Sequence, residues 1–401
     1  MRKTIVLMLF VLLSNIAFAQ TLSKNDFIED LEFLKKTLPA KHTNLFAKID
    51  SLSFEKKIDL IKAKADVLNE ETFIASLFKL TVSIGDEHTF IEPKFTKILP
   101  IQFELFKEGL FVTGIDPTHA ALLQTRLVAI NGQPTSKVIS LFNEAIQHYN
   151  PSYFDVYFLH FINNPTLLKG LGIINTDQEA EFTLIGTDGK ESKVKLGSVQ
   201  GNNISNVKLT QANSTLLLKK KKGNYWFDYD PDKRAIYINY NKCREEENNP
   251  FAKFNDELFA AIDQYKPTKI ILDLRYNSGG NSGILTPFIE KIKQSYLNRK
   301  EKFFVLIGKA TFSSAVMNAV ELKRNSNATF IGEPTSGNIN HYGEVRGFTL
   351  PKSKIVIGYS TRYWENWKGK KGPLTPDVAV SYSIKNYAAG KDEALAQVYS
   401  R

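Results

Sequence analysis

Cysteine is almost absent from this chain of 401 residues, because Cys243 is the only one. A single thiol excludes an intramolecular disulfide framework. The polar residues around Cys243 offer no obvious base, so we do not expect it to act as a nucleophile. After the first 20 residues, no apolar run is long enough to cross a bilayer. The sequence also lacks internal repeats, low-complexity tracts and any recognisable nucleic-acid-binding module.

The composition is that of a globular protein, with 43% hydrophobic and 12% aromatic residues. The length suggests two or three domains. The formal net charge is +10, and it is dispersed except for the lysine run at residues 219–222. We interpret that run as a solvated turn between two strands. Neither nucleic acid nor a membrane is therefore an expected partner.

Residues 1–19 have the pattern of a secretory signal peptide. Arg2 and Lys3 precede an apolar run at residues 5–13, and residues 17–19 (Ala-Phe-Ala) form a small-residue cleavage pattern. An uncleaved anchor is the alternative, but the run is shorter than the ~20 residues that a span needs. No cysteine follows the pattern for lipid attachment. We expect an exported protein, periplasmic or extracellular, that is not inserted in the membrane after cleavage.

In the rest of the chain, the pattern of apolar residues changes twice. Helical periodicity dominates residues 22–85, paired strands with one or two helices follow, and strands then alternate with helices from about residue 225. We predict a helical region at 20–95, a strand-rich module at 96–200 and an α/β domain with a partly parallel sheet at 201–401. The expected strands of that domain are 234–239, 269–274, 303–307, 328–331 and 355–359, and its expected helices are 252–265, 283–293 and 314–324.

Ser313 and Ser314 lie in a small-residue turn that follows an apolar strand and opens a helix. A serine at this place exposes its hydroxyl at a strand end, and the adjacent amides can stabilise a developing oxyanion. The alternative is an ordinary helix N-cap, which is a common role for serine. On this segment alone the cap is the stronger interpretation.

Two glycines, Gly279 and Gly280, end the apolar strand of KIILDLRYNSGG. Glycine lets the backbone approach a substrate carbonyl and leaves the N–H groups unobstructed. The alternative is a flexible turn between a strand and a helix. Asp273 and Arg275 lie at the end of the same strand, where we expect a buried structural pairing rather than catalysis.

A serine nucleophile needs a base. Of the six histidines, His88 is the candidate, because it lies in GDEHTFI between the end of a helix at Gly85 and a strand. Functional side chains concentrate at such loop ends, and histidine is suited to be a base near neutral pH.

Together these segments resemble the tail-specific protease (C-terminal processing peptidase) family. KIILDLRYNSGG resembles the family's strand and glycine turn, TFSSA its nucleophile turn, IGEPTSG the strand and turn after the nucleophile helix, and GPLTPDVAV a late Pro-Asp element. The order and spacing agree, and the resemblance covers most of residues 22–385. It implies a crotonase-like (ClpP/crotonase-type) catalytic core in residues 201–401, with a PDZ-like module before it.

The resemblance implies that Ser313 is the nucleophile and that the Ser314 amide, with the amide of Gly279 or Gly280, forms the oxyanion hole. One branch of the family has a lysine base directly after the glycine of its GEPTxG-like turn. This chain has Asn338 there, and asparagine cannot accept the proton. The resemblance is therefore to the tricorn-like serine–histidine branch, whose base matches His88.

Further positions complete the comparison with the tricorn-like branch. That branch has a serine before the histidine, where this chain has Glu87. It also has a late glutamate, for which Glu344 and Glu365 are the candidates, although either can equally be a surface carboxylate.

We expect a secreted serine-type endopeptidase, a hydrolase of peptides or unfolded protein segments that needs no metal or organic cofactor. The alternative is a non-catalytic ligand- or peptide-binding protein on the same fold.

Overall fold

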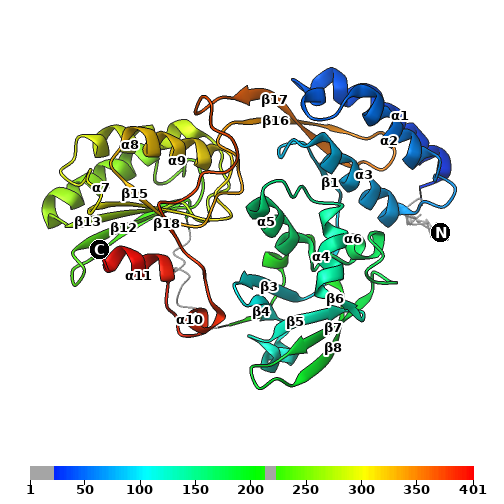
Figure 1. Cartoon of the computed structure of the whole chain (residues 1–401), viewed down its shortest axis with the longest axis horizontal. Coiled ribbons are helices and arrows are strands. Elements are labelled where there is room, and N and C mark those ends of the chain that lie inside the picture. The colour runs from blue at the N-terminus through cyan, green and yellow to red at the C-terminus, as the bar shows by residue number, and fades with distance from the viewer. Residues whose placement is uncertain (1–21, 213–222) are drawn as a thin grey trace, which may run out of the picture.

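Figure 1 shows the computed structural model of the chain, which describes residues 22–212 and 223–401. The predicted signal peptide and the lysine run at 219–222 lie outside these residues. Helices and sheets both contribute to the fold, so the α/β class is confirmed. Within the described ranges, no helix combines the length and the apolar character that a membrane span requires.

Three helices open the described chain, as the periodicity predicted: α1 (Lys24–Lys41), α2 (Ser51–Lys62) and α3 (Glu70–Ile84). Ser23 and Asp26 form a capping box at the start of α1. Gly85 ends α3 with a φ of 74°, a left-handed conformation that favours glycine. This cap turns the chain into the loop that carries His88.

The middle of the chain forms an antiparallel sheet in the order β10-β4-β5-β7-β8, with β3 paired to β4 and β6 to β5. The predicted strand pairs around residues 107–109 and 188–189 are present. Three helices accompany the sheet, one more than expected. The elements are β3 (Ile101–Phe106), β4 (Gly109–Ile115), β5 (Arg126–Ile130), β6 (Gln133–Pro134), α4 (Thr135–Asn143), α5 (Pro151–Phe161), α6 (Pro165–Gly170), β7 (Glu179–Ile185), β8 (Glu191–Gly197) and β10 (Thr210–Gln211). Beside them, β2 (Lys97–Ile98) pairs with β9 (Val199–Gln200).

The C-terminal half contains a six-stranded sheet in the order β11-β12-β13-β14-β15-β18, parallel from β12 onward. Its strands are β11 (Tyr225–Asp230), β12 (Ala235–Tyr240), β13 (Lys269–Asp273), β14 (Phe303–Ile307), β15 (Thr329–Gly332) and β18 (Val378–Ala379). One face packs on helices α7 (Phe251–Tyr265), α8 (Thr286–Lys293) and α9 (Ser314–Asn325), and the other on α11 (Glu393–Tyr399), which follows the short α10 (Ile384–Ala388). Every residue of β14 is buried, as expected for a parallel strand covered on both faces.

The parallel order of β13 and β14 brings the two predicted loops together. Both loops leave the carboxyl ends of neighbouring strands, so the glycine pair and the serine turn lie at one edge of the sheet. This edge is where open α/β sheets place their ligands.

A long hairpin leaves this half of the molecule and reaches the N-terminal helices (Figure 1). Its strands are β16 (His341–Thr349) and β17 (Val356–Trp364), and β17 pairs with β1 (Phe90–Glu92), which begins two residues after His88. The prediction that 355–359 is a strand is correct, but its placement in the α/β sheet is wrong, because a strand pattern does not identify the strand's partner. The buried Asp30 of α1 accepts hydrogen bonds from the N–H groups of Lys352 and Ser353 and fixes the hairpin turn.

Candidate active site

Ser313 has a strained backbone at the start of α9. Its φ is 52° and its ψ is −125°, an uncommon conformation for a residue with a Cβ. Such strain persists where the surrounding structure enforces it, and it concentrates at functional sites. The Ser313 side chain makes no capping hydrogen bond to the helix. The interpretation of Ser313 as an ordinary hydrogen-bonding N-cap is therefore wrong.

The two glycines let the neighbouring loops touch. A Cβ added to Gly279 would lie 2.9 Å from Ser313 Cβ and 3.0 Å from the Ser314 nitrogen. A Cβ added to Gly280 would lie 2.2 Å from the carbonyl oxygen of Cys243. Both glycines also have positive φ angles, 104° and 135°. Side chains are therefore excluded here by contact and by conformation together.

The backbone N–H groups in this turn differ in their partners. The Gly279 N–H donates to Asn277 Oδ1 at 2.9 Å, and Ser314 Oγ donates to the Gly280 carbonyl at 2.7 Å. Within the described ranges, the N–H groups of Gly280 and Ser314 make no hydrogen bond. These two amides are therefore available as donors to another group.

Replacing Gly280 by alanine is expected to lower the free energy of unfolding by about 2–3 kcal/mol, because of both the contact with Cys243 and the strained φ. Gly189→Ala is the matched control. Its φ is 78°, but nothing lies within 4 Å of the added Cβ, so about 1 kcal/mol is expected. Chemical denaturation measures both, and equal costs would show that the close approach at Gly280 is not enforced.

His88 lies in the loop between α3 and β1, and its ring is buried beside the serine turn. The ring stacks on Phe312, the residue before Ser313, with centroids 4.5 Å apart, and on His341 with centroids 5.2 Å apart. Both ring nitrogens are buried without a hydrogen-bond partner among the described residues. The structure thus brings His88 to the predicted nucleophile turn, but no hydrogen bond joins it to Ser313.

Burial lowers the pKa of His88 to about 3, and the charge of His341 adds to this effect, whereas Asp86 opposes it. The imidazole is therefore neutral between pH 5 and 8. A neutral ring is the protonation state in which histidine can accept a proton.

Asp86 organises the His88 loop. Burial would raise its pKa, but hydrogen bonds from His42, Ser360, Thr89 and the His88 backbone lower the pKa to about 2. The contact distances are 2.6 Å from Ser360 Oγ, 2.6 Å from Thr89 Oγ1 and 3.0 Å from His42 Nε2. Because Ser360 belongs to β17, this carboxylate also joins the loop to the long hairpin.

Glu87 and Asn338, the two departures from the family pattern, contact each other. The Asn338 N–H donates to Glu87 Oε1 at 2.9 Å, and Asn338 Nδ2 donates to Glu87 Oε2 at 2.9 Å. The Asn338 carbonyl in turn accepts from His341 Nδ1 at 2.8 Å. Asn338 therefore holds both the residue before His88 and the ring that stacks on His88.

Residues at and just before the start of α5, in the middle module, donate hydrogen bonds to the His88 loop and to the segment that precedes Asn338. Tyr153 Oη donates to the Glu87 carbonyl at 3.1 Å. Asn150 Nδ2 donates to the carbonyls of Ser336 at 2.7 Å and Thr335 at 3.1 Å. Residues from three parts of the chain therefore fix the surroundings of His88.

The stability of the fold is expected to decrease as pH rises from 6.5 to 8, because of Glu87. Burial raises the pKa of Glu87 to about 8 from 4.5, although the Asn338 N–H opposes this. The folded state then binds more protons than the unfolded state in this range, so stability is lost as pH increases. The expected loss is about 2 kcal/mol. Denaturation at pH 6.5 and 8 measures it, and an equal slope in Glu87→Gln would contradict the assignment.

The other residues singled out from the sequence lie away from His88 or have structural contacts. Glu344 on β16 has a half-exposed side chain 3.8 Å from Arg362, and Glu365 is exposed. Neither has a contact with His88, and the carboxylate whose charge acts on His88 is Asp86. Arg275 and Asp273 form the expected buried pair at 2.6 Å. Burial raises the pKa of the Cys243 thiol to about 11, which agrees with the absence of a nucleophilic role.

Sequence reasoning did not identify Asp86, His341 or the Glu87–Asn338 contact. Asp86 has a weak signal, because it lies two residues before His88 in GDEH. His341 and Asn338 have none, because only the fold brings them to His88.

No family model matches this chain, and no curated protein matches it. Solved structures do match. The structure of mature CPAF complexed with lactacystin covers 94% of this chain and 98% of its own, with a TM-score of 0.66 and 13% identity. The structure of a CPAF S499A mutant covers 94% of this chain and 96% of its own, with a TM-score of 0.66 and 11% identity. The photosystem II D1 C-terminal processing protease covers 92% of this chain and 98% of its own, with a TM-score of 0.40 and 12% identity. The chain thus shares the fold of CPAF over nearly its whole length, and the predicted resemblance to tail-specific proteases is confirmed at the level of the fold.

Proposed function

We propose that this protein is an exported serine-type peptidase that hydrolyses peptides or unfolded protein segments. The observation that carries the proposal is the strained turn of Ser313, whose side chain does not cap α9 and which packs against Gly279. His88, which stacks on Phe312, provides a neutral imidazole beside that turn.

In the proposed reaction, Ser313 Oγ attacks the scissile carbonyl while His88 takes its proton and later gives it to the leaving amine. The Ser314 N–H and the unoccupied Gly280 N–H are the favoured oxyanion donors, because the Gly279 N–H is held by Asn277. Removing one such donor typically costs ~3–4 kcal/mol of barrier. The bond from Ser313 to His88 has to form when substrate binds, as is common for catalytic contacts.

The finer assignments of the fold belong to the same proposal. Residues 201–401 are assigned to a crotonase-like catalytic core and residues 96–200 to a PDZ-like module. Such a module would hold an extended peptide by strand addition. Strand β3, which pairs only with β4 among the described strands, supports this because its other edge is unpaired.

One observation favours the alternative, a binding protein on the same fold. Both nitrogens of His88 lack a hydrogen-bond partner among the described residues, so the serine–histidine contact is not formed. A protein that only holds a ligand would not need that contact.

Labelling with a fluorophosphonate probe separates the two functions. Wild type and Ser314→Ala are expected to react, whereas Ser313→Ala and His88→Ala are expected not to react. Wild type that is folded by circular dichroism and remains unlabelled in the presence of unfolded protein would favour the binding protein.

A further inference from the structure

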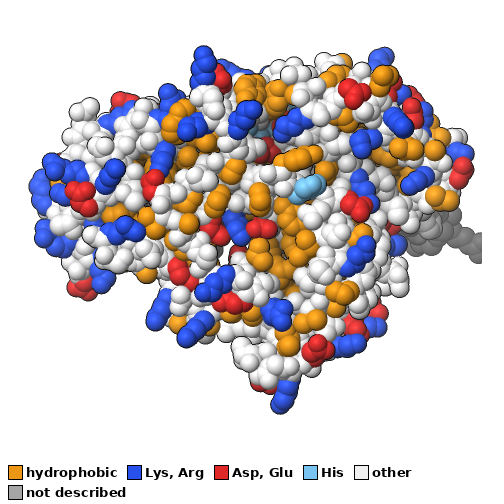
Figure 2. Space-filling model, in the orientation of Figure 1, with side chains coloured by type: hydrophobic (Ala, Val, Ile, Leu, Met, Phe, Trp, Pro, Cys, Tyr) orange, Lys and Arg blue, Asp and Glu red, His pale blue; other side chains and the backbone are white. Residues whose placement is uncertain are grey.

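A pocket of about 430 Å³ lies between the middle module and the C-terminal half. Strand β3, helix α5, the loops after β13 and β14, and the segment around α10 form its walls. Figure 2 shows the hollow near the centre of this face, with apolar side chains beside acidic and basic ones. Leu105, Val156 and Leu159 contribute apolar walls. The pocket can therefore cover an aliphatic chain.

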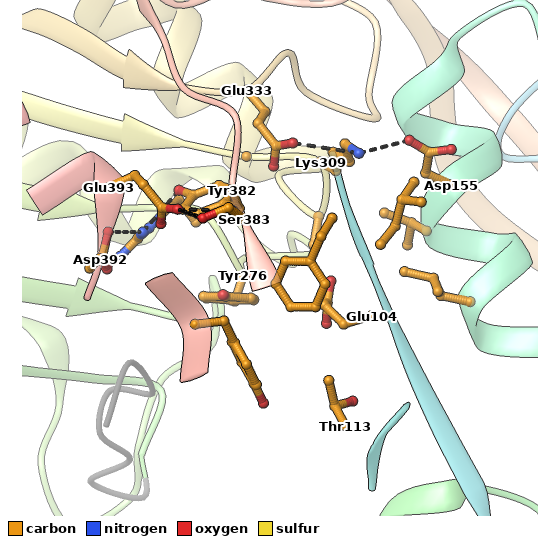
Figure 3. Close-up of a pocket in the computed structure, with 18 of the residues that line it drawn as sticks. Glu104, Thr113, Asp155, Tyr276, Lys309, Glu333, Tyr382, Ser383, Asp392 and Glu393 are labelled. Carbon is orange, nitrogen blue, oxygen red and sulfur yellow. Dashed lines mark hydrogen bonds and ion pairs between the residues drawn. The ribbon is translucent and has the colours of Figure 1, made fainter. Parts of the chain in front are cut away.

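The pocket walls carry five acidic and two basic side chains, and the basic ones are already neutralised. Lys309 Nζ lies 2.8 Å from Asp155 and 3.5 Å from Glu333. The Arg275 guanidinium lies 2.9 Å from Asp392 and also pairs with a second buried aspartate, as the dashed lines in Figure 3 partly show. No positive charge of the walls is left to attract an anion.

Glu104 of β3 is the acidic side chain that remains. Glu393 accepts hydrogen bonds from the N–H of Ser383 and from Asn386 Nδ2. In the part of the chain that the structure describes, the Glu104 carboxylate has neither an ion pair nor a hydrogen bond to another side chain. Figure 3 shows it near Tyr276, a residue that is 55% exposed. Glu104 is solvent-exposed within the pocket, but the surrounding walls partly desolvate its carboxyl group and raise its pKa to about 7; Glu333 adds to this, whereas Lys309 and the Leu105 N–H oppose it.

An unpaired carboxylate near an accessible aromatic ring and apolar walls matches one kind of group. A lysine or arginine side chain can lay its aliphatic stem on the walls and direct its charge to the carboxylate and the ring. An anion would meet excess negative charge, and a neutral group would leave Glu104 without an ion-pair partner of its own.

The pocket lies close to the candidate active site along both loops. Tyr276 precedes Gly279 by three residues, and Ala310 precedes Ser313 by three. Three residues span at most about 11 Å. An extended peptide held at Ser313 therefore reaches the pocket within three or four residues.

We propose that this pocket receives a lysine or arginine side chain of the substrate, three or four residues from the cleaved bond. The proposal rests on the peptidase function and adds a preference for basic residues at a fixed distance from the cut. Glu104 supplies the counter-charge, and Tyr276 supplies the aromatic surface.

The test uses acetylated, amidated decapeptides in which one arginine is moved along the sequence, each paired with a citrulline peptide of the same shape. At one position relative to the cut, wild type is expected to show a kcat/KM roughly tenfold higher for arginine than for citrulline. In Glu104→Gln this ratio is expected to fall to within about twofold, while citrulline peptides are cleaved as before. An unchanged ratio in that variant would overturn the proposal.

Two further variants keep this result specific. Glu191→Gln removes one exposed carboxylate from β8, which is not part of the pocket lining, and is expected to keep the wild-type ratio. Tyr276→Leu keeps an apolar wall without the ring and is expected to lower the ratio. If the arginine-to-citrulline ratio falls as much in Glu191→Gln as in Glu104→Gln, the preference comes from the overall charge, and the proposal for the pocket is overturned.

A binding assay separates failure of the proposed peptidase function from failure of the proposed binding of a basic side chain in the pocket. If wild type cleaves no peptide, fluorescence anisotropy of dye-labelled arginine and citrulline decapeptides still tests the pocket. Tighter binding of the arginine peptide that is lost in Glu104→Gln would support it. Equal binding of the two peptides by wild type would overturn it.

Discussion

Replacing Ser313 by alanine is expected to reduce kcat/KM for the hydrolysis of an unfolded, fluorescently labelled protein by roughly 10⁴–10⁶-fold. The variant keeps the fold and the free amides, but it removes the oxygen that attacks the carbonyl. His88→Ala is expected to have an effect of similar size, because the serine hydroxyl is a weak nucleophile without a base. Combining the two substitutions should add little, because residues that act as a unit are not additive.

Ser314→Ala is the matched control, because it changes the adjacent residue in the same turn. Its hydroxyl donates to the Gly280 carbonyl, and losing one hydrogen bond costs about 1 kcal/mol. The rate should therefore fall by tenfold or less. Activity of Ser313→Ala within tenfold of wild type, or loss in Ser314→Ala alone, would exclude Ser313 as the nucleophile.

Asn338→Asp is expected to keep kcat/KM within about tenfold of wild type at pH 6.5 and 8.5, and to abolish the loss of stability between pH 6.5 and 8. The substitution places a second carboxyl group against buried Glu87 in place of an amide donor. Two such charges about 4 Å apart would repel by about 4 kcal/mol at an effective dielectric constant of 20, which moves the pKa of Glu87 well above 8. One proton is therefore retained between the two groups throughout this range. Denaturation at pH 6.5 and 8 and the pH profile of kcat/KM measure the effect, and a wild-type loss of stability in the variant would contradict it.

Adding Glu87→Gln to Asn338→Asp is expected to leave kcat/KM at pH 8.5 within about threefold of wild type. The glutamine amide can donate to the new carboxylate, and its oxygen can accept the N–H of residue 338, so both contacts return and the side-chain contact has reversed polarity. A double variant that loses activity at pH 8.5, where Asn338→Asp keeps it, would mean that the proton on Glu87, and not the pair of hydrogen bonds, positions the His88 loop.

Local elements were predictable because their signals are local. The all-apolar segment of β14 was placed at residues 303–307, and Gly85 was expected to end a helix. The glycine pair and the serine turn were also correctly placed, each after a strand. The physical reason is that buried parallel strands have continuous apolar runs, whereas glycine has positive φ without steric cost.

Features that depend on distant partners were not predictable. The strand at 355–359 was recognised, but its pairing with β1 depends on a register that the sequence pattern does not encode. Glu87 and Asn338 were each noted as a departure, yet only the fold shows that they are hydrogen-bond partners. Glu344 and Glu365 were considered as orienting carboxylates, whereas Asp86 is the carboxylate whose charge acts on His88.

The separation of Glu87 and Asn338 along the chain delays the assembly of the site during synthesis. The two residues are 251 positions apart. A ribosome that adds about 5–20 residues per second needs roughly 10–50 s to cover that distance. For most of this interval Phe312 has not been made, and His341 follows only after Asn338. On the proposed peptidase function, a nascent chain therefore cannot cleave its neighbours on the ribosome before this contact has formed.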